Sequence, residues 1–204
     1  MGATSFRLVL GGTVLMADTS FKVFAAAAVR TTAAQDRWLI GQGVDPEWLY
    51  GGASRYGALR VAANDNGQWS PADEGQNFIV VPENPLSDPW DRISRDVGDL
   101  VACDPRAPEK MFSIAGCPII NPFAVDYARH YEIDLRVFSN PVAYLVGKQV
   151  GCVIADWREM TAFKLTGPRK IVCDSLEIAE RVDALFVAAR GPAIHIVNTE
   201  SEAA

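Results

Sequence analysis

Apolar and polar positions alternate most regularly in the middle of the chain, between Asp99 and Asp156. Residues 100–102 are a short apolar run that predicts a strand, and residues 111–115 resume the strand pattern. The proline-containing segment 104–108 between them is typical of a turn. These three segments together predict a β-hairpin.

Two asparagine–proline pairs predict helix starts in the same region. Asn121 precedes Pro122 and Asn140 precedes Pro141. Asparagine is a favoured N-cap, and proline is favoured at the first helical position. In the first helix one face at helical spacing carries Phe123, Ala124, Tyr127, Ala128 and Tyr131.

Strand patterns accompany both helices. Residues 133–137 are apolar at every second position, which is the period of a strand with one buried face. Residues 152–155 are apolar throughout, as in a strand covered on both faces. Gly147 and Gly151 loosen the chain before this second strand. The order of strand, helix and strand predicts a βαβ unit.

A second such unit follows. Residues 170–173 predict a strand, and Asp174 and Glu177 have the spacing of a capping box at a helix start. The predicted buried face of this helix consists of Ile178, Val182, Leu185, Phe186 and Ala189. A glycine–proline pair at 191–192 ends the helix, and residues 193–197 predict a returning parallel strand.

The N-terminal part has weaker patterns. Residues 6–17 predict a hairpin that turns at Gly11 and Gly12. The alanine-rich segment that follows predicts a helix with a buried stripe. Its N-cap is Asp18, Thr19 or Ser20, and its stripe is Phe21, Phe24, Ala25 and Ala28.

Further elements are predicted before the first proline-rich segment. Helical turns are expected around Trp38 and after Asp45, and strands over residues 59–63 and 78–81.

The proline-rich segment 82–89 is the candidate domain boundary. It separates an N-terminal portion, residues 1–81, from an α/β portion, residues 90–204, or it is a long surface connection within one continuous domain of residues 1–198. The predicted fold class is α/β, with α+β as the alternative. We expect a mixed sheet with C-terminal βαβ units and an N-terminal hairpin plus helices.

Composition narrows the possible partners. The 204-residue chain has a formal net charge of −6 and a pI near 4.9. Proteins that bind the nucleic-acid backbone in general carry basic patches, so this class is not expected, although a local basic face remains possible.

No membrane association is expected either. The apolar segment 8–16 is interrupted by two glycines and lacks the features of a signal peptide, and Phe6 stands where a myristoylation motif needs Ser or Thr. No apolar run in the sequence is long enough to cross a bilayer. We therefore expect a cytoplasmic protein.

The cysteines and histidines carry no motif. Cys103, Cys117, Cys152 and Cys173 are widely spaced without a CxxC pair, and we interpret them as reduced core residues rather than metal ligands or disulfide partners. His130 can be paired with Cys117 or Ser139 as a nucleophile and base, but nothing in the sequence fixes either pairing.

Three aspartates are the candidate site residues. Asp104, Asp156 and Asp174 each follow a predicted strand, and open α/β sheets bind ligands at the carboxyl ends of their strands. Converging carboxylates suit Mg²⁺, which prefers oxygen ligands. In the structural alternative, Asp174 is a helix cap and Asp104 starts a turn, which leaves only Asp156 without a local role.

Four segments carry a family resemblance: GDLVACDPRAPEKMFSIAGCPIINP, LRVFSNPVAYLVGKQVGCVIADW, IVCDSLEIAERVDALF and PAIHIV. They resemble a group of uncharacterised alphaproteobacterial proteins carried on prophages and mobile elements, often near primase- or helicase-like genes. The resemblance covers the C-terminal half and rests on the apolar pattern and a few Pro, Gly and Asp positions. It implies a role in mobile-element DNA metabolism or host interaction, and it assigns no catalytic residue.

Two functional hypotheses follow. The favoured one is a non-catalytic interaction protein of a phage or mobile element, without a cofactor, that binds a host or replication protein. It predicts an exposed apolar or acidic patch. The alternative is a Mg²⁺-dependent enzyme that processes nucleotides or nucleic acids. It requires Asp156 to converge with Asp104 or Asp174.

Overall fold

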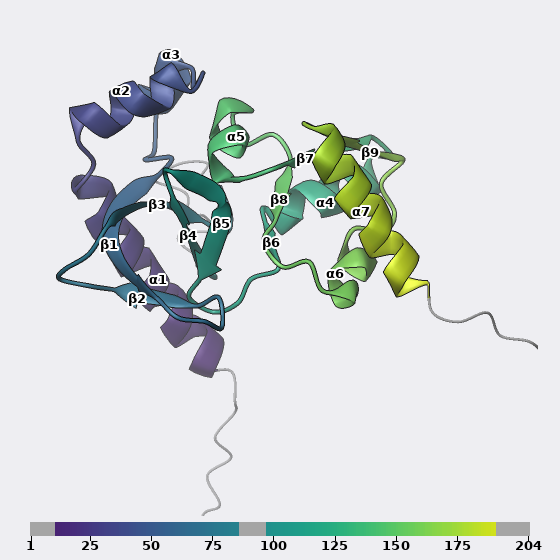
Figure 1. The fold of residues 1–204 in the computed structure, drawn as a ribbon, viewed down its shortest axis with the longest axis horizontal. Helices are drawn as coiled ribbons and strands as arrows, with labels where there is room; N and C mark the ends of the chain where they lie inside the picture. The colour runs from purple at the N-terminus through teal and green to yellow at the C-terminus, as the bar shows by residue number, and fades with distance from the viewer. Residues whose placement is uncertain (1–10, 86–96, 191–204) are drawn as a thin grey trace, which may run out of the picture.

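The structure is a computed structural model that describes residues 11–85 and 97–190. Two β-sheets lie side by side with helices between and around them (Figure 1). The mixture of helices and strands confirms the predicted α/β class, and the second sheet is mixed, as expected.

In the described residues three helices come first, six strands follow, and helices and strands alternate from α4 to α7. The helices are α1 (Gly11–Val29), α2 (Ala33–Gly41), α3 (Pro46–Tyr50), α4 (Pro122–His130), α5 (Pro141–Val146), α6 (Glu159–Lys164) and α7 (Leu176–Ala189). The strands are β1 (Gly57–Ala63), β2 (Trp69–Pro71), β3 (Asn77–Pro82), β4 (Leu100–Asp104), β5 (Ala107–Ser113), β6 (Ile119–Ile120), β7 (Asp134–Phe138), β8 (Cys152–Ile154) and β9 (Lys170–Cys173).

Sheet 1 contains β1 to β5 and is antiparallel, in the order β2-β1-β3-β4-β5. It curls until its two edges approach each other, because the backbone N–H of Ser113 on β5 donates to the carbonyl of Gly67 in the β1–β2 turn. The indole Nε1 of Trp69 donates to the carbonyl of Leu100 across the inside of the curl, at 3.0 Å. This curled face is the one that α1 covers.

A hairpin was predicted over residues 6–17, but residues 11–17 belong to helix α1, so the prediction is wrong for them. Residues 6–10 of the predicted hairpin lie outside the described part of the chain. The alanine-rich sequence favours a long helix. The buried side chains on α1 include Phe24 and Ala27, whereas Ala25 of the predicted stripe is exposed. Gly57 on β1 makes this packing possible, since a Cβ there would lie 2.4 Å from that of Ala27.

Sheet 2 contains β6 to β9 in the order β6-β8-β7-β9. Strand β7 is parallel to both β8 and β9, and β6 is antiparallel to β8, so the first predicted βαβ unit, β7-α5-β8, is confirmed. In β8, Val153 faces one apolar cluster while Cys152 and Ile154 face another, which contains residues from α4, α6 and α7. Both faces of the sheet are therefore covered along β8, as its continuous apolar run predicted. The strand predicted over 193–197 lies outside the described residues.

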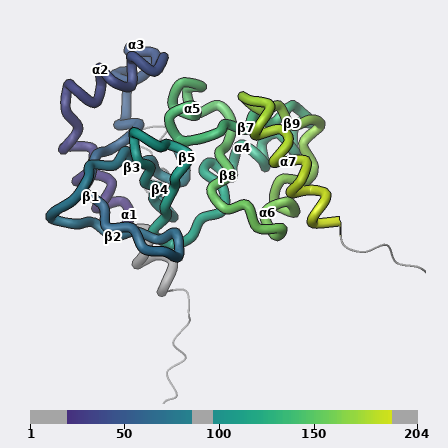
Figure 2. Tube along the Cα trace, in the orientation of Figure 1, coloured from purple at the N-terminus to yellow at the C-terminus, as the bar shows by residue number. Residues whose placement is uncertain are grey.

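The proposed boundary at 82–89, between portions 1–81 and 90–204, joins β3 to β4. These two strands are hydrogen-bonded neighbours, with Val80 opposite Ala102. Sheet 1 therefore takes strands from both sides of the proline-rich segment. The chain passes from sheet 1 to sheet 2 later, in the connection between β5 and β6 (Figure 2).

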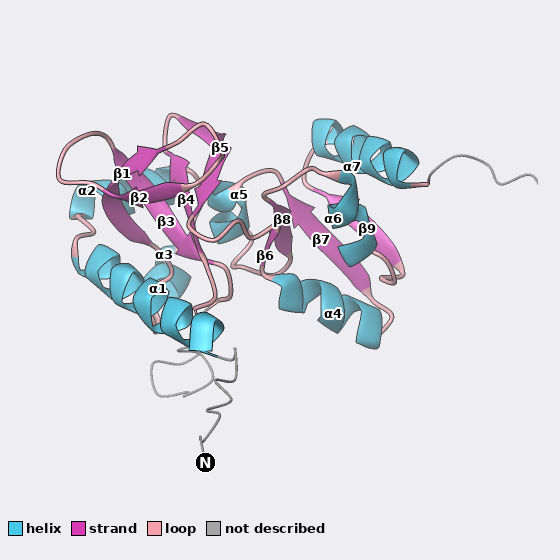
Figure 3. Cartoon of the chain, turned by 90° about the horizontal axis from the view of Figure 1, so that it is seen from below, coloured by secondary structure: helices cyan, strands magenta, loops and turns pink. Residues whose placement is uncertain are grey.

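Helix α5 lies between the two sheets (Figures 1 and 3). Its side chains Tyr144 and Leu145 are fully buried. They belong to one apolar cluster with Val81 and Val101 of sheet 1 and with Val153 of sheet 2. The two sheets therefore share a core.

The buried carboxylate of Asp99 fixes the connection from sheet 1 to sheet 2. Its Oδ1 accepts hydrogen bonds from the backbone N–H groups of Leu100, Ile114 and Ala115 at 2.7 to 3.0 Å. Its Oδ2 accepts from the N–H of Cys117 at 2.8 Å. One side chain thus satisfies four backbone donors, most of them in the turn that leaves β5.

We expect Asp99→Ala to lower the free energy of unfolding by about 3 kcal/mol or more, because it leaves the buried N–H groups of Leu100 and Cys117 without this acceptor. Asp99→Asn retains one acceptor oxygen and should cost less. Urea unfolding followed by circular dichroism measures both changes. The matched control is Asp126→Ala, which removes an exposed ion pair with Arg129 and should change stability by at most about 0.5 kcal/mol. If Asp99→Ala and Asp126→Ala lowered the free energy of unfolding equally, Asp99 would not have the proposed role in holding the backbone N–H groups.

Candidate functional site

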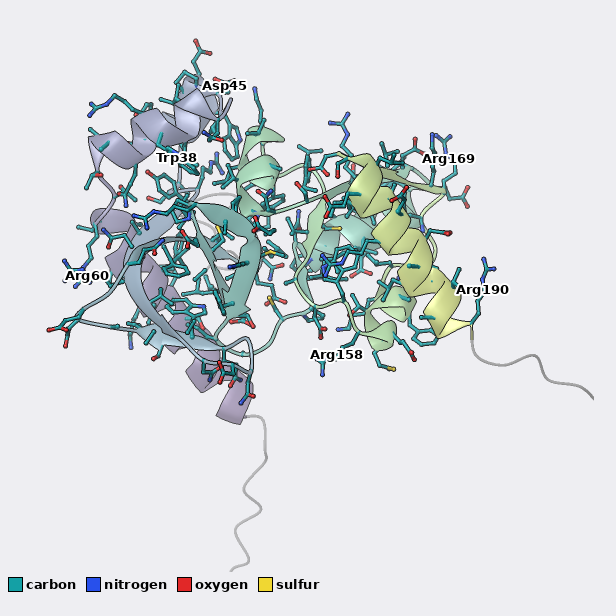
Figure 4. All side chains as sticks on the ribbon, in the orientation of Figure 1. Trp38, Asp45, Arg60, Arg158, Arg169 and Arg190 are labelled. Carbon is teal, nitrogen blue, oxygen red and sulfur yellow. The ribbon has the colours of Figure 1, made fainter. Side chains whose placement is uncertain are left out.

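Asp156 lies just beyond the carboxyl end of β8, where the sequence places it. Its Oδ1 accepts from the backbone N–H of Arg158 at 3.1 Å, and its Oδ2 accepts from the Nε of the same residue at 2.6 Å. Burial alone would raise the pKa of Asp156, but the hydrogen bonds and charge of Arg158 hold it below its ordinary value. Asp156 therefore has a local partner that the sequence did not indicate. Figure 4 labels Arg158 beside α6.

Asp174 lies at the end of β9 and joins that strand to its neighbour β7. Its Oδ2 accepts from the backbone N–H of Ser139 at 2.8 Å and from the Ser139 hydroxyl at 2.9 Å. The predicted capping box of Asp174 and Glu177 is wrong. The N-cap of α7 is Ser175, whose hydroxyl accepts from the N–H of Ile178.

Asp104 belongs to the other sheet, in the turn between β4 and β5. Its Oδ1 accepts from the amide of Gln76 and from the backbone N–H of Arg106. Each of the three candidate aspartates thus has its own hydrogen-bond partners. Asp156 and Asp174 line different pockets. In the part of the chain that the structure describes, no three His, Cys, Asp or Glu side chains are grouped to hold a metal ion.

The candidate nucleophile pairs are not assembled. Ser139 donates its hydroxyl hydrogen bond to Asp174, and the His130 ring meets the edge of Tyr131, with ring centroids 4.7 Å apart. Cys117 is buried. Burial, followed by the charges of Asp99 and Glu83, raises the pKa of its thiol well above the ordinary range. His130 makes no hydrogen bond to Cys117 or Ser139 in the described structure.

A concave surface larger than the pockets beside Asp156 and Asp174 lies elsewhere on sheet 2. It is a groove of about 920 Å³ between α4, the start of β7 and the loop that enters β8, and we call it the α4–β7 groove. Its lining residues are Asn121, Phe123, Ala124, Tyr127, Ala128, Ile133, Asp134, Leu135, Arg136, Gly147, Lys148, Gln149, Val150, Gly151 and Val172.

Apolar side chains form the walls of the groove and remain open to solvent. Phe123, Tyr127 and Val150 are 64%, 57% and 62% exposed, and Ile133 and Val172 are also exposed. The helix face on which the sequence places Phe123 and Tyr127 is therefore exposed at these two aromatic positions. The buried residues of this helix are Val125 and Ala128, while its aromatic residues line the groove or lie beside it.

Two buried amide side chains form the polar part of the groove. The Nδ2 of Asn121 donates to the carbonyls of Gln149 and Gly151, at 3.3 and 2.8 Å. Asn121 precedes α4 as predicted, but its side chain makes no capping hydrogen bond. Gln149 is 7% exposed, and its Nε2 has no hydrogen-bond partner in the described structure.

The backbone around these amides is in an uncommon conformation. Asn121, Lys148 and Gln149 have φ values of 60°, 55° and 61°, in the left-handed region. Such a conformation costs about 1–3 kcal/mol for a residue other than glycine and often occurs at functional sites. Three of the four described non-glycine residues with positive φ line this one groove.

Two glycines bring the loop 147–151 against β7. A Cβ at Gly147 would lie 2.2 Å from the ring of Phe138, and a Cβ at Gly151 would lie 2.5 Å from the carbonyl oxygen of Arg136. Only glycine allows this close approach. From the sequence, both glycines were expected to make the chain more flexible before the strand at 152–155. Nothing in the sequence indicated that the residues between them line a groove.

The charged residues of the groove are unequally paired. Lys148 forms an ion pair with Asp45 at 2.6 Å, and Arg169 forms one with Asp134 at 2.9 Å. The hydrogen bond from Lys148 holds the pKa of Asp45 below its ordinary value. Arg136 is exposed and has no ion pair within the described residues. Figure 4 labels Asp45 near the start of α3 and Arg169 close to β9.

Comparison with known proteins gives no relative: no family model, curated protein or solved structure matches the chain. Among the described helices, none combines the length and apolar character needed to cross a membrane.

A metal titration tests the arrangement of the aspartates. We expect Mg²⁺ or Mn²⁺ to leave the melting temperature where NaCl of equal ionic strength leaves it, because the three carboxylates bind separate donors. If the carboxylates did form a metal site, saturating metal would raise the melting temperature by about 5–10 °C. A rise in the wild-type protein that is lost in Asp156→Ala would support the Mg²⁺-dependent enzyme.

Thiol labelling tests the interpretation of the cysteines. Burial raises the pKa of Cys103, Cys117 and Cys152, the last to about 12. We expect a disulfide reagent at neutral pH to react with Cys173 alone in the native protein, since that thiol is half-buried, and with all four after unfolding. Cys173→Ser should remove the native reaction. Rapid native labelling of Cys117 would contradict its burial.

Proposed function

We propose that this protein binds another protein through the α4–β7 groove and that it acts without catalysis. The observation that carries the proposal is the row of exposed apolar side chains along the groove, from Phe123 and Tyr127 to Val150. A contiguous exposed apolar surface with aromatic residues is typical of protein-binding sites.

The position of the groove supports binding rather than catalysis. The groove lies where β7 begins and where the chain enters β8. Open α/β sheets bind ligands and reacting groups at the opposite edge, beyond the carboxyl ends of the strands. At that edge Asp156 and Asp174 already accept hydrogen bonds from neighbouring residues.

The shape of the groove also fits a protein partner. Aromatic side chains provide a large contact area with few rotatable bonds, so they lose little entropy on binding. Phe123 and Tyr127 stand on one helix, four residues apart, and therefore present their rings on the same side. They form a ready contact surface for a partner segment.

The resemblance to prophage and mobile-element proteins indicates the class of partner. A protein encoded near primase- or helicase-like genes meets the replication proteins of its element and of its host. We propose that the partner belongs to one of these two groups.

Site-specific photo-crosslinking in the producing cell tests this function. A benzophenone side chain at Tyr127 should yield one discrete adduct with a second protein, which mass spectrometry identifies. Phe123→Ser should reduce this adduct strongly, because loss of an aromatic hot spot costs about 2 kcal/mol or more, or roughly 30-fold in affinity.

Two controls use exposed apolar residues outside the groove. Leu176→Ser removes a side chain that is more exposed than Phe123 and should leave the adduct unchanged. A benzophenone at Val187 on α7 should yield no such adduct. If the benzophenone at Val187 gave as much of this adduct as the benzophenone at Tyr127, the groove would not be a specific binding site. An adduct with the mass of two copies of this chain would show self-association in place of the proposed partner.

A further inference from the structure

We infer that the α4–β7 groove selects a peptide segment in which an apolar side chain lies next to a carboxylate. This inference rests on the proposed function and specifies the chemistry of the partner.

The first support is the charge of the groove. Lys148 and Asp134 are already neutralised by Asp45 and Arg169. Arg136 is the remaining charged residue of the lining, and it has no ion pair within the described residues. The groove therefore carries one uncompensated positive charge in a chain whose formal net charge is −6. A partner carboxylate would complement it.

The second support is the buried amide of Gln149. Its Nε2 is a hydrogen-bond donor without an acceptor in the described structure, although the residue is more than nine-tenths buried. A buried donor without an acceptor is unfavourable. Of the two unpaired donors among the lining residues, the Arg136 guanidinium belongs to an exposed residue and the Gln149 Nε2 is itself buried. They favour a ligand that accepts, such as a carboxylate or a peptide carbonyl.

The third support is the distance between the charged and apolar parts of the groove. A Cβ at Gly151 would lie 2.8 Å from the Cβ of Arg136, so the loop that carries Gln149 and Val150 packs directly against Arg136. On the neighbouring strand, Val172 is the register partner of Arg136. Cation and apolar wall are thus adjacent. An extended peptide advances about 3.3 Å per residue, so an acidic residue directly beside the apolar one matches the groove.

A nucleic-acid backbone fits the same surface poorly. Binding to phosphates requires several cations that act together. The groove offers a single unpaired one in an acidic chain, whereas its apolar walls match a hydrophobic side chain.

A peptide-display selection tests the inference. The probe is a random peptide library, selected on the immobilised full-length protein and eluted at increasing salt. We expect the enriched peptides to carry Asp or Glu next to Leu, Phe or Trp. Synthetic versions should bind roughly tenfold more weakly when the acidic residue is changed to its amide, and to a similar degree when the protein carries Arg136→Gln.

Matched variants separate charge from folding. Arg136→Lys keeps the positive charge and should retain most of the binding that Arg136→Gln loses. Arg136 is exposed, and a melting curve for each variant confirms that it is folded. Phe123→Ser should abolish the binding of all selected peptides, and Leu176→Ser should not affect it.

The outcomes distinguish the two proposals. Peptides that depend on Phe123 but show no acidic preference and no effect of Arg136→Gln would overturn the inference and leave the proposed function intact. A selection that yields no Phe123-dependent peptide would overturn the groove as a protein-binding site, and the inference with it.

Discussion

The packing of α5 between the two sheets is the constraint on which the rest of the structure depends. Tyr144 and Leu145 are fully buried there, in an apolar cluster to which both sheets contribute. Neither sheet alone can bury these two side chains of α5. Burial of a side chain of this size stabilises a fold by about 1.5–3 kcal/mol, so the shared core joins the two sheets into one unit.

The same helix positions the α4–β7 groove. Helix α5 ends at Val146, and the loop that follows carries Lys148 and Gln149 in left-handed conformations before it enters β8. The start of this loop is fixed by the buried helix, and its end is fixed by pairing of β8 with β7. The groove is therefore built from a strained loop held at both ends, which keeps its polar and apolar groups in place without a ligand.

The buried and half-buried acidic groups of this protein mostly stabilise turns and strand ends. Asp99 satisfies backbone donors between the two sheets, Asp174 links the ends of β7 and β9, and Asp104 orders the β4–β5 turn. Acidic residues that follow strands are common in both enzymes and structural turns, and the sequence does not distinguish these uses. The distinction depends on which donors the fold brings to each carboxylate.

The sequence by itself determined the elements that depend on local signals. Asn140 caps α5 through hydrogen bonds to the next backbone amides, and the alternating residues 133–137 correspond to β7, because caps and strand period are properties of adjacent residues. Tertiary structure decided the rest. The side chain of Asn121 donates to the loop at Gln149 instead of capping α4, and the aromatic side chains of α4 stay exposed. Both outcomes depend on which distant parts of the chain pack against α4, and local periodicity does not encode that packing.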